Sequence, residues 1–372
     1  MRIALVGTGY VADYYYRTLQ TYPHLQIVGA WDTRPEALAH FCTAHSLRAF
    51  SSYEALLSSD ADIVVNLTNP QAHFEVSHAA LLAGKHVYSE KPLGMDMAEA
   101  RQLVALADSK NLTLSGAPCS LLGESAQTLW RELRRGRIGQ VYCAYAEMDD
   151  GLVHNMAYTS WLSETGIPWP SKNEFETGCT LEHAGYYLTW FPAFFGPATH
   201  VTAMSSTLIG NKRTDEILQP NAADFSVATI THQSGVVVRL TCSIVAEHDH
   251  QLRIFGNDGT LSIEDSWFYG SPVKVQKSFN LRRRQLTSPK LPVRLAAKPA
   301  KHEYRGSQQM DFARGINEMA EAITQGRRCR LGADYMLHVN ELVLAVHHAG
   351  PTGASVPITS TFEPVQPMDW AR

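Results

Sequence analysis

Hydrophobic positions in the first 118 residues alternate between two spacings. Short, nearly continuous apolar runs are typical of strands buried on both faces. They occur at RIALVG, LQIVGAW, DIVVNL, KHVYS and LTLSG. Between them lie stretches with helical spacing, at VADYYYRTLQ, PEALAHFCTAH, SYEALLSS, QAHFEVSHAALLAG and DMAEARQLVALADSK. This alternation of strands and helices predicts a doubly wound parallel sheet of the α/β class.

The pattern changes after the helix-like stretch SAQTLWRELRRGRIG. Strand-like runs now follow one another, several with no helix between them, which favours an antiparallel sheet. They are VYCAYAEM, HVTAMSSTLI, DFSVATITH, GVVVRLTCSIV, HQLRIFG and GTLSIEDSWFY. Two helices, DFARGINEMAEAITQ and DYMLHVNELVLAVHHAG, are predicted late in the chain. We therefore expect an α/β domain over residues 1–118 and an α+β domain over residues 119–372.

Length and composition fit this division. A chain of 372 residues is too long for one ordinary core, and 45% hydrophobic with 18% charged residues is typical of a folded protein. A net charge of -4 gives no reason to expect a nucleic acid partner. No apolar stretch is long enough to span a membrane, and the apolar N-terminal run is too short for a signal peptide. The six cysteines are scattered without a CxxC pair, so we expect no disulfides, no metal site and a cytoplasmic location.

One segment is strongly basic. Ten Lys or Arg residues and a single acid, Glu303, lie between Ser271 and Gly306, and Arg282–Arg284 are the densest part. The simpler interpretation is a solvated loop or flap. The alternative is an electrostatic lid over a substrate that carries phosphate.

The first apolar run ends in the sequence VGTGYVA, which spaces Gly7, Gly9 and Ala12 as G-x-G-x-x-A. The first glycine permits a tight turn, the second lets a diphosphate approach the backbone, and the small third residue packs helix on strand. The free N–H groups at the start of the following helix then hold the anion. Because this motif opens the chain between a strand and a helix, it predicts dinucleotide binding by Gly7, Thr8, Gly9, Tyr10, Val11 and Ala12.

A carboxylate at the end of the second run supports this prediction. Asp32 follows Ala12 by twenty residues, at the distance where an acid accepts hydrogen bonds from a ribose. Its negative charge repels a 2′-phosphate, so NAD is favoured. Thr33 and Arg34 come next, and an arginine here can bind a phosphate, so NADP stays open. After DIVVNL, the turn formed by Thr68, Asn69, Pro70 and the nearby His73 is expected to line the same cofactor.

The sequence SEKPLG places Glu90, Lys91 and Pro92 after the run KHVYS, at the carboxyl edge where such sheets bind ligands. Proline pre-sets the backbone there, and such a bond is sometimes cis. A lysine beside a bound dinucleotide can hold the reacting oxygen. Its ordinary pKa of about 10.4 falls when it is desolvated or when it lies near a positive charge such as an oxidised nicotinamide.

Taken together, these residues resemble the glucose–fructose oxidoreductase and inositol dehydrogenase (Gfo/Idh/MocA) family. The resemblance covers nearly the whole chain and depends on GTGYVA, Asp32, the NP-x-x-H turn, EKPLG and the two late helices. It implies a Rossmann domain followed by a domain with a large open-faced, mainly antiparallel sheet. It also implies oxidation or reduction of hydroxyl or keto groups of sugars, cyclitols or nucleotide sugars, and association into dimers or tetramers through that sheet.

Such enzymes usually carry a D-x-x-x-H pair on a helix, facing the nicotinamide. The corresponding stretch here is GCTLEHAGYYLTWF, and two registers are open. One equates Glu182 with the aspartate and Tyr186 with the histidine; the other equates His183 and Tyr187 with them. The first keeps an acid in the acidic position, and we favour it. In both, tyrosine replaces histidine, and a tyrosine hydroxyl is a competent proton donor to a developing alkoxide.

A second departure concerns substrate contacts. The asparagine and arginine that relatives often place after LTLSG are missing from APCSLL. Trp161, Trp169 and Lys172 are candidates to replace them, because a tryptophan face suits the apolar side of a sugar ring.

We therefore expect an NAD(P)-dependent oxidoreductase that transfers a hydride between nicotinamide and a hydroxyl or keto carbon. In this hypothesis Lys91 orients the oxygen, Tyr186 relays the proton and Glu182 tunes the pair. Two alternatives stay open: an NAD-dependent glycosidase with no net redox change, and a non-catalytic dinucleotide-binding regulator.

Overall fold

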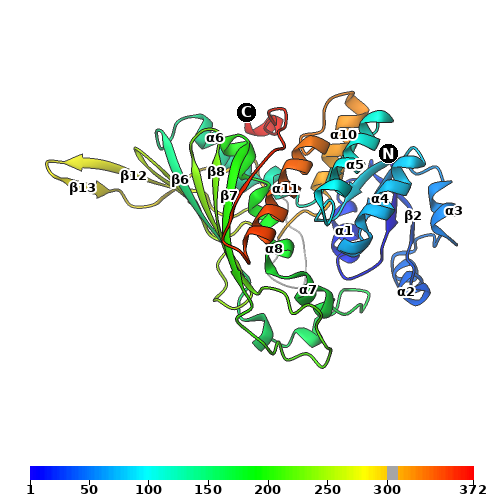
Figure 1. The fold of residues 1–372 in the computed structure, drawn as a ribbon. Helices are drawn as coiled ribbons and strands as arrows, with labels where there is room; N and C mark the ends of the chain where they lie inside the picture. The colour runs from blue at the N-terminus through cyan, green and yellow to red at the C-terminus, as the bar shows by residue number, and fades with distance from the viewer. Residues whose placement is uncertain (300–308) are drawn as a thin grey trace. The chain divides into compact units, whose positions relative to one another are not determined.

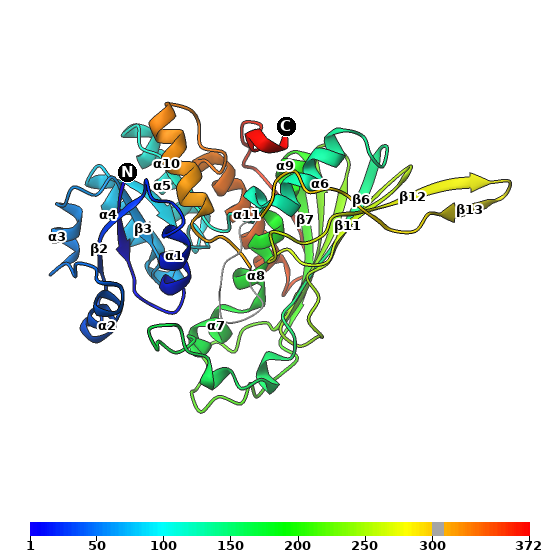
Figure 2. The ribbon, with the colours of Figure 1, turned by 180° about the vertical axis from the view of Figure 1, so that it is seen from behind.

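The computed structural model describes residues 1–299 and 309–372, and the chain forms two compact units (Figures 1 and 2). The first unit contains Met1–Cys119, Ala157–Asn173 and Phe312–Asn340. The second contains Ser120–Met156, Glu174–Asp311 and Glu341–Arg372 within the described ranges.

The first unit is built on a parallel sheet, as the apolar runs predict. Its described strands are β1 (Arg2–Val6), β2 (Gln26–Trp31), β3 (Ile63–Asn66), β4 (His86–Ser89) and β5 (Leu114–Gly116). They lie in the order β2-β1-β3-β4-β5, and every neighbouring pair is parallel. The side chains of β3 are all buried, as expected for a strand covered on both faces.

Helices separate these strands in sequence. They are α1 (Ala12–Leu19), α2 (Pro35–His45), α3 (Tyr53–Leu57), the 3₁₀ turn η1 (Pro70–Ala72), α4 (His73–Leu82) and α5 (Met97–Ser109). Two begin at side-chain caps, because Ser52 accepts from Ala55 N and Asp96 accepts from Glu99 N. Pro35 occupies the first position of α2, where its missing N–H is of no consequence. The predicted doubly wound sheet is confirmed.

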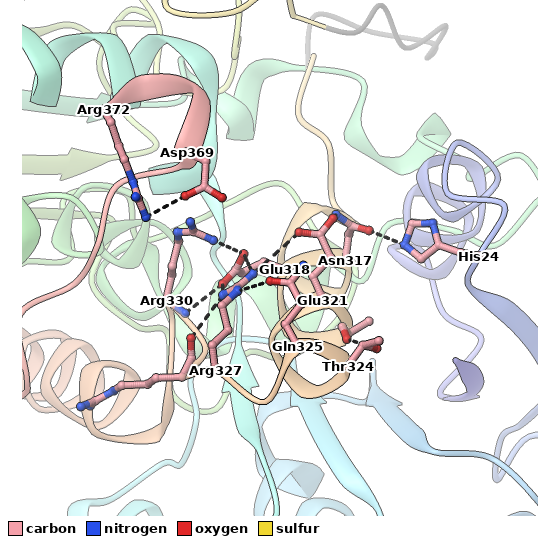
Figure 3. Close-up of polar contacts among 12 residues, drawn as sticks. His24, Asn317, Glu318, Glu321, Thr324, Gln325, Arg327, Arg330, Asp369 and Arg372 are labelled. Carbon is pink, nitrogen blue, oxygen red and sulfur yellow. Dashed lines mark hydrogen bonds and ion pairs between the residues drawn. The ribbon is translucent and has the colours of Figure 1, made fainter.

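Two later segments complete the first unit. Helix α10 (Arg314–Gln325) places Ile316, Met319 and Ala320 in the same core as Ile3 and Leu5. Its buried Glu318 accepts hydrogen bonds from Arg327 and Arg330, each at 2.6 Å (Figure 3). A buried carboxylate needs such partners, because an unpaired charge is costly away from water.

The segment 157–173 contains the 3₁₀ turn η4 (Tyr158–Ser160) and reaches α1 through Asp13. Asp13 accepts from Thr165 N and Thr165 Oγ1, both at 2.9 Å. Helices α7 (Ser171–Thr177) and α11 (Ala333–Ala349) each run from the first unit into the second.

The second unit is built on a large sheet. Its described strands are β6 (Val141–Asp149), β7 (Ala198–Ser206), β8 (Phe225–His232), β9 (Val237–Ser243), β10 (Leu252–Gly256), β11 (Gly259–Ile263), β12 (Lys274–Leu281), β13 (Arg284–Thr287), β14 (Leu291–Pro292) and β15 (Ser355–Pro357). The order is β13-β12-β11-β10-β6-β9-β8-β7-β15, with β14 beside β12. Among these described strands β6 and β9 pair in parallel and the other pairs are antiparallel.

One face of this sheet is covered and the other is open. Ala144, Ala146 and Met148 of β6 are buried on the covered face, against which α8 (Cys179–Leu188) packs. Tyr145 and Met204 lie on the other face and are 36% and 49% exposed. The predicted open-faced sheet is confirmed. The remaining described elements are η2 (Ser120–Leu122), α6 (Glu124–Arg134), η3 (Val153–Asn155), α9 (Phe191–Phe195) and η5 (Asp369–Ala371).

The basic segment differs from the loop that its composition suggests. Residues 274–287 form the hairpin β12–β13, which projects beyond the other strands (Figures 1 and 2). Arg282 and Arg283 make the turn, and Arg282 has φ 57°. Lys301, Glu303 and Arg305 lie outside the described residues.

Candidate active site

The glycine loop follows β1 and leads into α1. Gly7 has φ +94°, and a Cβ there would lie 2.7 Å from the carbonyl carbon of Leu67, so the position accepts no larger residue. A Cβ on Gly9 would come no closer than 3.8 Å to Arg34 Nη2, so the space in front of Gly9 is open. Ala12 is fully buried at the start of α1. One glycine fixes the turn and the other leaves room for an anion to approach the backbone.

Asp32 lies at the end of β2 with 9% of its surface exposed. One oxygen, Oδ2, accepts from Thr8 N at 2.7 Å and from Thr8 Oγ1 at 2.9 Å. The other, Oδ1, accepts from Arg34 N at 2.8 Å. Burial alone would raise the pKa of Asp32, but the hydrogen bonds from Arg34 and Thr8 lower it, so the group is an anion at neutral pH.

The guanidinium of Arg34 lies against Asp32, with Nε 3.2 Å from Oδ1, and its side chain is 59% exposed. Thr33 between them is exposed. The carboxylate, the open glycine and the tight turn together fit the ribose and diphosphate of a dinucleotide. Tyr10 is half-buried and Val11 lies at the N-terminal end of α1.

The turn after β3 is tied to the segment after β4. Buried Asn66 accepts from Thr68 Oγ1 at 2.6 Å and donates to His73 O at 3.1 Å. The His73 ring lies between two carbonyl oxygens, with Nδ1 2.8 Å from Pro92 O and Nε2 2.9 Å from Thr68 O. Burial lowers the pKa of His73, so the ring is neutral and donates to one of these carbonyls. Its side chain therefore supports the loops, while half-buried Pro70 and exposed Asn69 lie in the turn itself.

Lys91 is half-buried and its bond to Pro92 is cis. The neighbouring Glu90 is fixed by two donors, since its Oε1 accepts from Tyr15 OH at 2.7 Å and its Oε2 accepts from Lys91 N at 3.0 Å. These contacts fix the backbone that carries the lysine at the carboxyl edge of the parallel sheet.

The proposed substrate loop also belongs to the first unit. The rings of Trp161 and Trp169 meet edge to face at 5.1 Å, and Trp169 N donates to Trp161 O at 2.9 Å. Both tryptophans are half-buried and Lys172 is exposed. The two indoles therefore pack on each other, with part of each surface left accessible.

Helix α8 of the second unit carries the two candidate catalytic pairs. Glu182 is 5% exposed, and Tyr187 is fully buried with its hydroxyl donating to His250 O. Burial raises the pKa of Tyr187 well above its ordinary value. His183 and Tyr186, three residues apart, are half-buried instead. Each register thus pairs one buried residue with one accessible residue, and the accessible residues of the two registers are His183 and Tyr186.

His183 and Tyr186 share an aromatic neighbour, Trp267. The ring centroids of Tyr186 and Trp267 are 5.3 Å apart, and those of His183 and Trp267 are 6.2 Å apart. Indole edges and faces in this arrangement hold the two side chains on one side of the helix.

His183 also belongs to a chain of charged groups. Its Nε2 lies 2.8 Å from Asp150 Oδ2, and the other oxygen of Asp150 lies 2.6 Å from His250 Nε2. His250 Nδ1 is 3.5 Å from Asp265 Oδ1, which is an ion-pair distance but too long for a well-aligned hydrogen bond.

The protonation of this chain follows from its partners. Burial alone would raise the pKa of Asp150, but His183 and His250 lower it strongly. Burial would lower the pKa of His250, but Asp150 and Asp265 raise it to about 9. His250 is therefore a buried imidazolium between two carboxylates at neutral pH.

Sequence reasoning missed Asp150, His250, Asp265 and Trp267. They come from separate parts of the second unit, at the end of β6 and in the segments beside β10 and β11. The run His248-Asp249-His250 was the one local signal that pointed to them. Asp150, His248 and His250 are also the group of possible metal ligands found among the described residues, with ligand atoms within 4.8 Å of one another. Two of these atoms already share the 2.6 Å contact between Asp150 and His250.

No helix in the described part of the chain has the length and apolar character needed to cross a membrane.

Comparison with known proteins agrees with the fold and the site geometry. Residues 1–117 match the model of an "Oxidoreductase family, NAD-binding Rossmann fold", and residues 126–262 match the "GFO/IDH/MocA C-terminal domain". Trans-1,2-dihydrobenzene-1,2-diol dehydrogenase of Macaca fuscata fuscata is 29% identical over 270 residues, which cover 70% of this chain and 73% of the relative.

UDP-N-acetylglucosamine 3-dehydrogenase of Acidithiobacillus ferrooxidans is 33% identical over 116 residues, or 31% of this chain. The chain matches only 36% of the length of that curated relative. The fold is shared with the WlbA dehydrogenase of Bordetella pertussis, solved with NADH and UDP-GlcNAcA, at a TM-score of 0.73 and 19% identity over 96% of this chain and 99% of that one. The two matched domain models, the parallel sheet and the open-faced sheet show that this chain belongs to the Gfo/Idh/MocA family of NAD(P)-dependent oxidoreductases.

Proposed function

We propose that this protein oxidises or reduces a ring carbon that carries a hydroxyl or keto group, in a sugar, cyclitol or nucleotide sugar. The observation that supports this most directly is the buried Asp32 carboxylate beside the open Gly9, because the pair suits an adenosine ribose and a diphosphate. Nicotinamide, when bound, accepts or supplies the hydride in this reaction.

Side chains of the protein carry out the remaining steps. Lys91 binds the reacting oxygen and stabilises its developing negative charge. The hydroxyl of Tyr186, on the accessible side of α8, relays the proton. Glu182 and Tyr187 are buried, so we assign them a supporting role on α8. We assign residues 1–118 to cofactor binding and residues 119–372 to substrate binding and association.

The cofactor in this proposal is NAD, with NADP as the weaker ligand. Asp32 is an anion, and it would repel a 2′-phosphate at the ribose. Arg34 neutralises part of the negative charge of Asp32, and its side chain is largely exposed. Because an exposed guanidinium can contact a 2′-phosphate, Arg34 is the residue that permits NADP to bind.

The names of two relatives support a ring compound with neighbouring polar groups as the substrate. One is named for a trans-dihydrobenzenediol and another for the 3-position of UDP-N-acetylglucosamine. Trp161 and Trp169 offer indole surface for the apolar side of a ring, and exposed Lys172 offers a cation for an anionic group. We also propose a homodimer or homotetramer that forms through the open sheet, and a cytoplasmic protein, in keeping with its six free cysteines.

A substrate screen tests this proposal. Purified protein is incubated with NAD and with NADP and a panel of sugars, inositols, UDP-sugars and trans-dihydrodiols, and formation of reduced nicotinamide is followed by absorbance. Turnover of at least one ring alcohol is expected. Cleavage of aryl glycosides by copurified cofactor without net reduction would indicate the glycosidase alternative, and cofactor binding without turnover on the whole panel would indicate a regulator.

A further inference from the structure

We propose that Asp13 is a positioning residue for the substrate. It anchors residues 161–169, the tryptophan hairpin, to helix α1 and so holds Trp161 and Trp169 as a ring-binding surface. This inference rests on the proposed function, but its structural part is tested without turnover. All of these residues belong to the first unit.

Backbone hydrogen bonds make residues 161–169 a hairpin. Trp169 N donates to Trp161 O at 2.9 Å, and Ser163 N donates to Ile167 O at 2.8 Å. The odd-numbered side chains from 161 to 169 are half-buried, whereas the even-numbered positions between them are exposed. This alternation is that of a strand pair with one face covered, and both tryptophans lie on the covered face.

Thr165 lies at the tip of the tryptophan hairpin, on the same face as the two indoles. Its N–H and its hydroxyl both donate to Asp13 Oδ2 at 2.9 Å. Asp13 is only 3% exposed. Burial alone would raise the pKa of Asp13, but the hydrogen bonds to it, first of all from His45, lower it. The carboxylate is therefore an anion, and hydrogen bonds to an anion are stronger than those between neutral groups.

Asp13 is itself fixed from a second helix. Its Oδ1 lies 2.8 Å from Nε2 of His45, the last residue of α2. The His45 ring stacks on Tyr16 with centroids 3.8 Å apart and meets Phe41 edge to face at 4.7 Å. One oxygen of Asp13 is thus held by α2, and the other is left to hold Thr165.

The anchor belongs to the helix that follows the glycine loop. Asp13 is the second residue of α1 and comes directly after Ala12, which ends the G-x-G-x-x-A motif. In the proposed function the N–H groups of this first turn hold the diphosphate. The same helical turn therefore serves the cofactor and the tryptophan hairpin, which makes the ring-binding surface a part of the cofactor-binding unit.

Ring contacts extend the order of the anchor to the indoles. Trp169 lies 5.1 Å from Trp161 and 5.8 Å from buried Tyr158, both in edge-to-face geometry. Contacts of this kind limit rotation of the rings. Both indoles keep part of their surface accessible, and that surface suits the apolar face of a sugar or cyclitol ring. Asp13 therefore acts on substrate binding through the tryptophans.

A purely structural role of Asp13 is the competing interpretation, because an acid in the first turn of a helix stabilises that helix. Glu54 provides the control, since it is an acid in the first turn of α3 in the same unit. Asp13→Asn is the conservative variant, because its side-chain oxygen still accepts from Thr165. Thr165→Val removes the hydroxyl donor at the tip and leaves α1 unchanged, so it tests the anchor even if Asp13→Ala fails to fold.

Fluorotryptophan NMR tests the anchor without turnover. Protein labelled with fluorotryptophan is compared for the wild type and these four variants, with Trp161→Phe and Trp169→Phe assigning the signals. The wild type should give one narrow signal for each indole. Asp13→Ala should shift or broaden both signals, and Thr165→Val should do so to a smaller extent. Asp13→Asn should stay close to the wild type, and Glu54→Ala should match it.

Kinetics on the best ring alcohol of the screen complete the test. Asp13→Ala should raise KM for the ring alcohol by about 10- to 100-fold, the size expected when hydrogen bonds to a charged acceptor are lost. Its kcat and cofactor affinity should be nearly unchanged, because only binding of the ring is affected. In a Trp161→Leu background Asp13→Ala should raise KM no further, since Asp13 acts through the indole.

The outcomes separate this inference from the proposed function. Unchanged indole signals in Asp13→Ala and Thr165→Val overturn the anchor whether or not the protein is an active dehydrogenase. Changed signals with an unchanged KM, or a rise in KM that persists in full in the Trp161→Leu background, overturn the positioning role. Absence of wild-type turnover on every ring alcohol overturns the proposed function and the ring-binding role together, while the NMR comparison still decides the anchor.

Discussion

At the residue scale, Asp32 is the side chain that we propose determines the preference for NAD over NADP. Its carboxylate accepts from Thr8 and from Arg34 N, and it lies where β2 ends. These donors hold one rotamer, so the carboxylate is preorganised for a ribose. Arg34 lies two residues later, and its positive charge lies next to the Asp32 carboxylate. We therefore expect Arg34 to weaken the selection of NAD over NADP.

We therefore predict that Asp32→Ser weakens NAD binding by about 10- to 100-fold, since charged hydrogen bonds contribute about 1.5–3 kcal/mol. NADP binding should weaken less or improve, because the repulsion of its 2′-phosphate is removed. Isothermal titration with both cofactors measures the ratio, with Asp60→Asn as the control for an exposed carboxylate of the same unit. An unchanged ratio would show that Asp32 does not contact the ribose.

The raised pKa of His250 predicts how the free energy of unfolding depends on pH. Its folded-state pKa of about 9 lies above the ordinary histidine value of about 6.5. A group whose pKa is raised on folding contributes stability that is complete below the unfolded pKa and is lost as pH rises through the folded pKa. Between about pH 6.5 and 9 the free energy of unfolding should fall by up to about 3 kcal/mol through this residue.

Denaturant unfolding at a series of pH values checks this. The wild type should lose stability over that window, and His250→Gln should show a shallower slope even though its stability at neutral pH is lower. Equal slopes for the two proteins would mean that His250 is not an imidazolium in the folded state.

At the scale of elements, the structure shows which side chains of α8 are accessible, which the sequence pattern could not show. Residues four apart share a helical face, so the sequence grouped Glu182 with Tyr186 and His183 with Tyr187. Packing in the folded protein buries Glu182 and Tyr187, whereas His183 and Tyr186 stay partly accessible. Which side of a helix is covered is a tertiary property, and a mixed aromatic sequence such as CTLEHAGYYL does not display it.

The two neighbouring tyrosines should respond differently to loss of their hydroxyls. Tyr186→Phe is expected to lower kcat by about 10²- to 10⁴-fold without affecting thermal stability. Tyr187→Phe removes a buried hydrogen bond to His250 O and should cost about 1–2 kcal/mol of stability with most of the activity retained. Loss of activity in Tyr187→Phe together with loss of stability in Tyr186→Phe would contradict the proposed roles of the two tyrosines.

Most elements of the fold could be predicted from sequence, because apolar runs of strand length and helical spacing are local signals. The β12–β13 hairpin could not. Two-residue hairpin turns usually carry asparagine or glycine, whereas this turn is Arg282-Arg283 with a positive φ at an arginine. The Asp150–His250–Asp265 chain was equally hidden, since its members are far apart in sequence and meet only after the second unit has folded.

At the scale of the whole molecule, the open sheet is the surface with the strongest case for self-association. Tyr145, Met204 and Val237 are large apolar residues exposed on it at 36%, 49% and 40%. Arg239 and Arg253 lie over the Tyr145 ring at 4.6 and 5.8 Å. Exposed apolar area of this kind typically marks an interface.

We predict that Tyr145→Asp combined with Met204→Asp converts a dimer or tetramer into a smaller species, because charge is depleted at interface cores. Light scattering coupled to gel filtration measures the mass. A charge change on the projecting hairpin, Arg283→Glu, is the control for surface charge alone. A monomeric wild type, or an assembly that survives the paired substitution, would exclude association through this face.

The proposed dehydrogenase chemistry depends on Lys91. It is tested by the rate of nicotinamide reduction by the wild type and by Lys91→Ala on the best ring alcohol of the screen. We predict that the variant binds NADH like the wild type, because Asp32 and the glycine loop are intact. Its kcat should be lower by about 10²- to 10³-fold, since one electrostatic contact to the reacting oxygen typically contributes that much. Near-normal turnover by Lys91→Ala with intact cofactor binding would contradict the proposed dependence on Lys91.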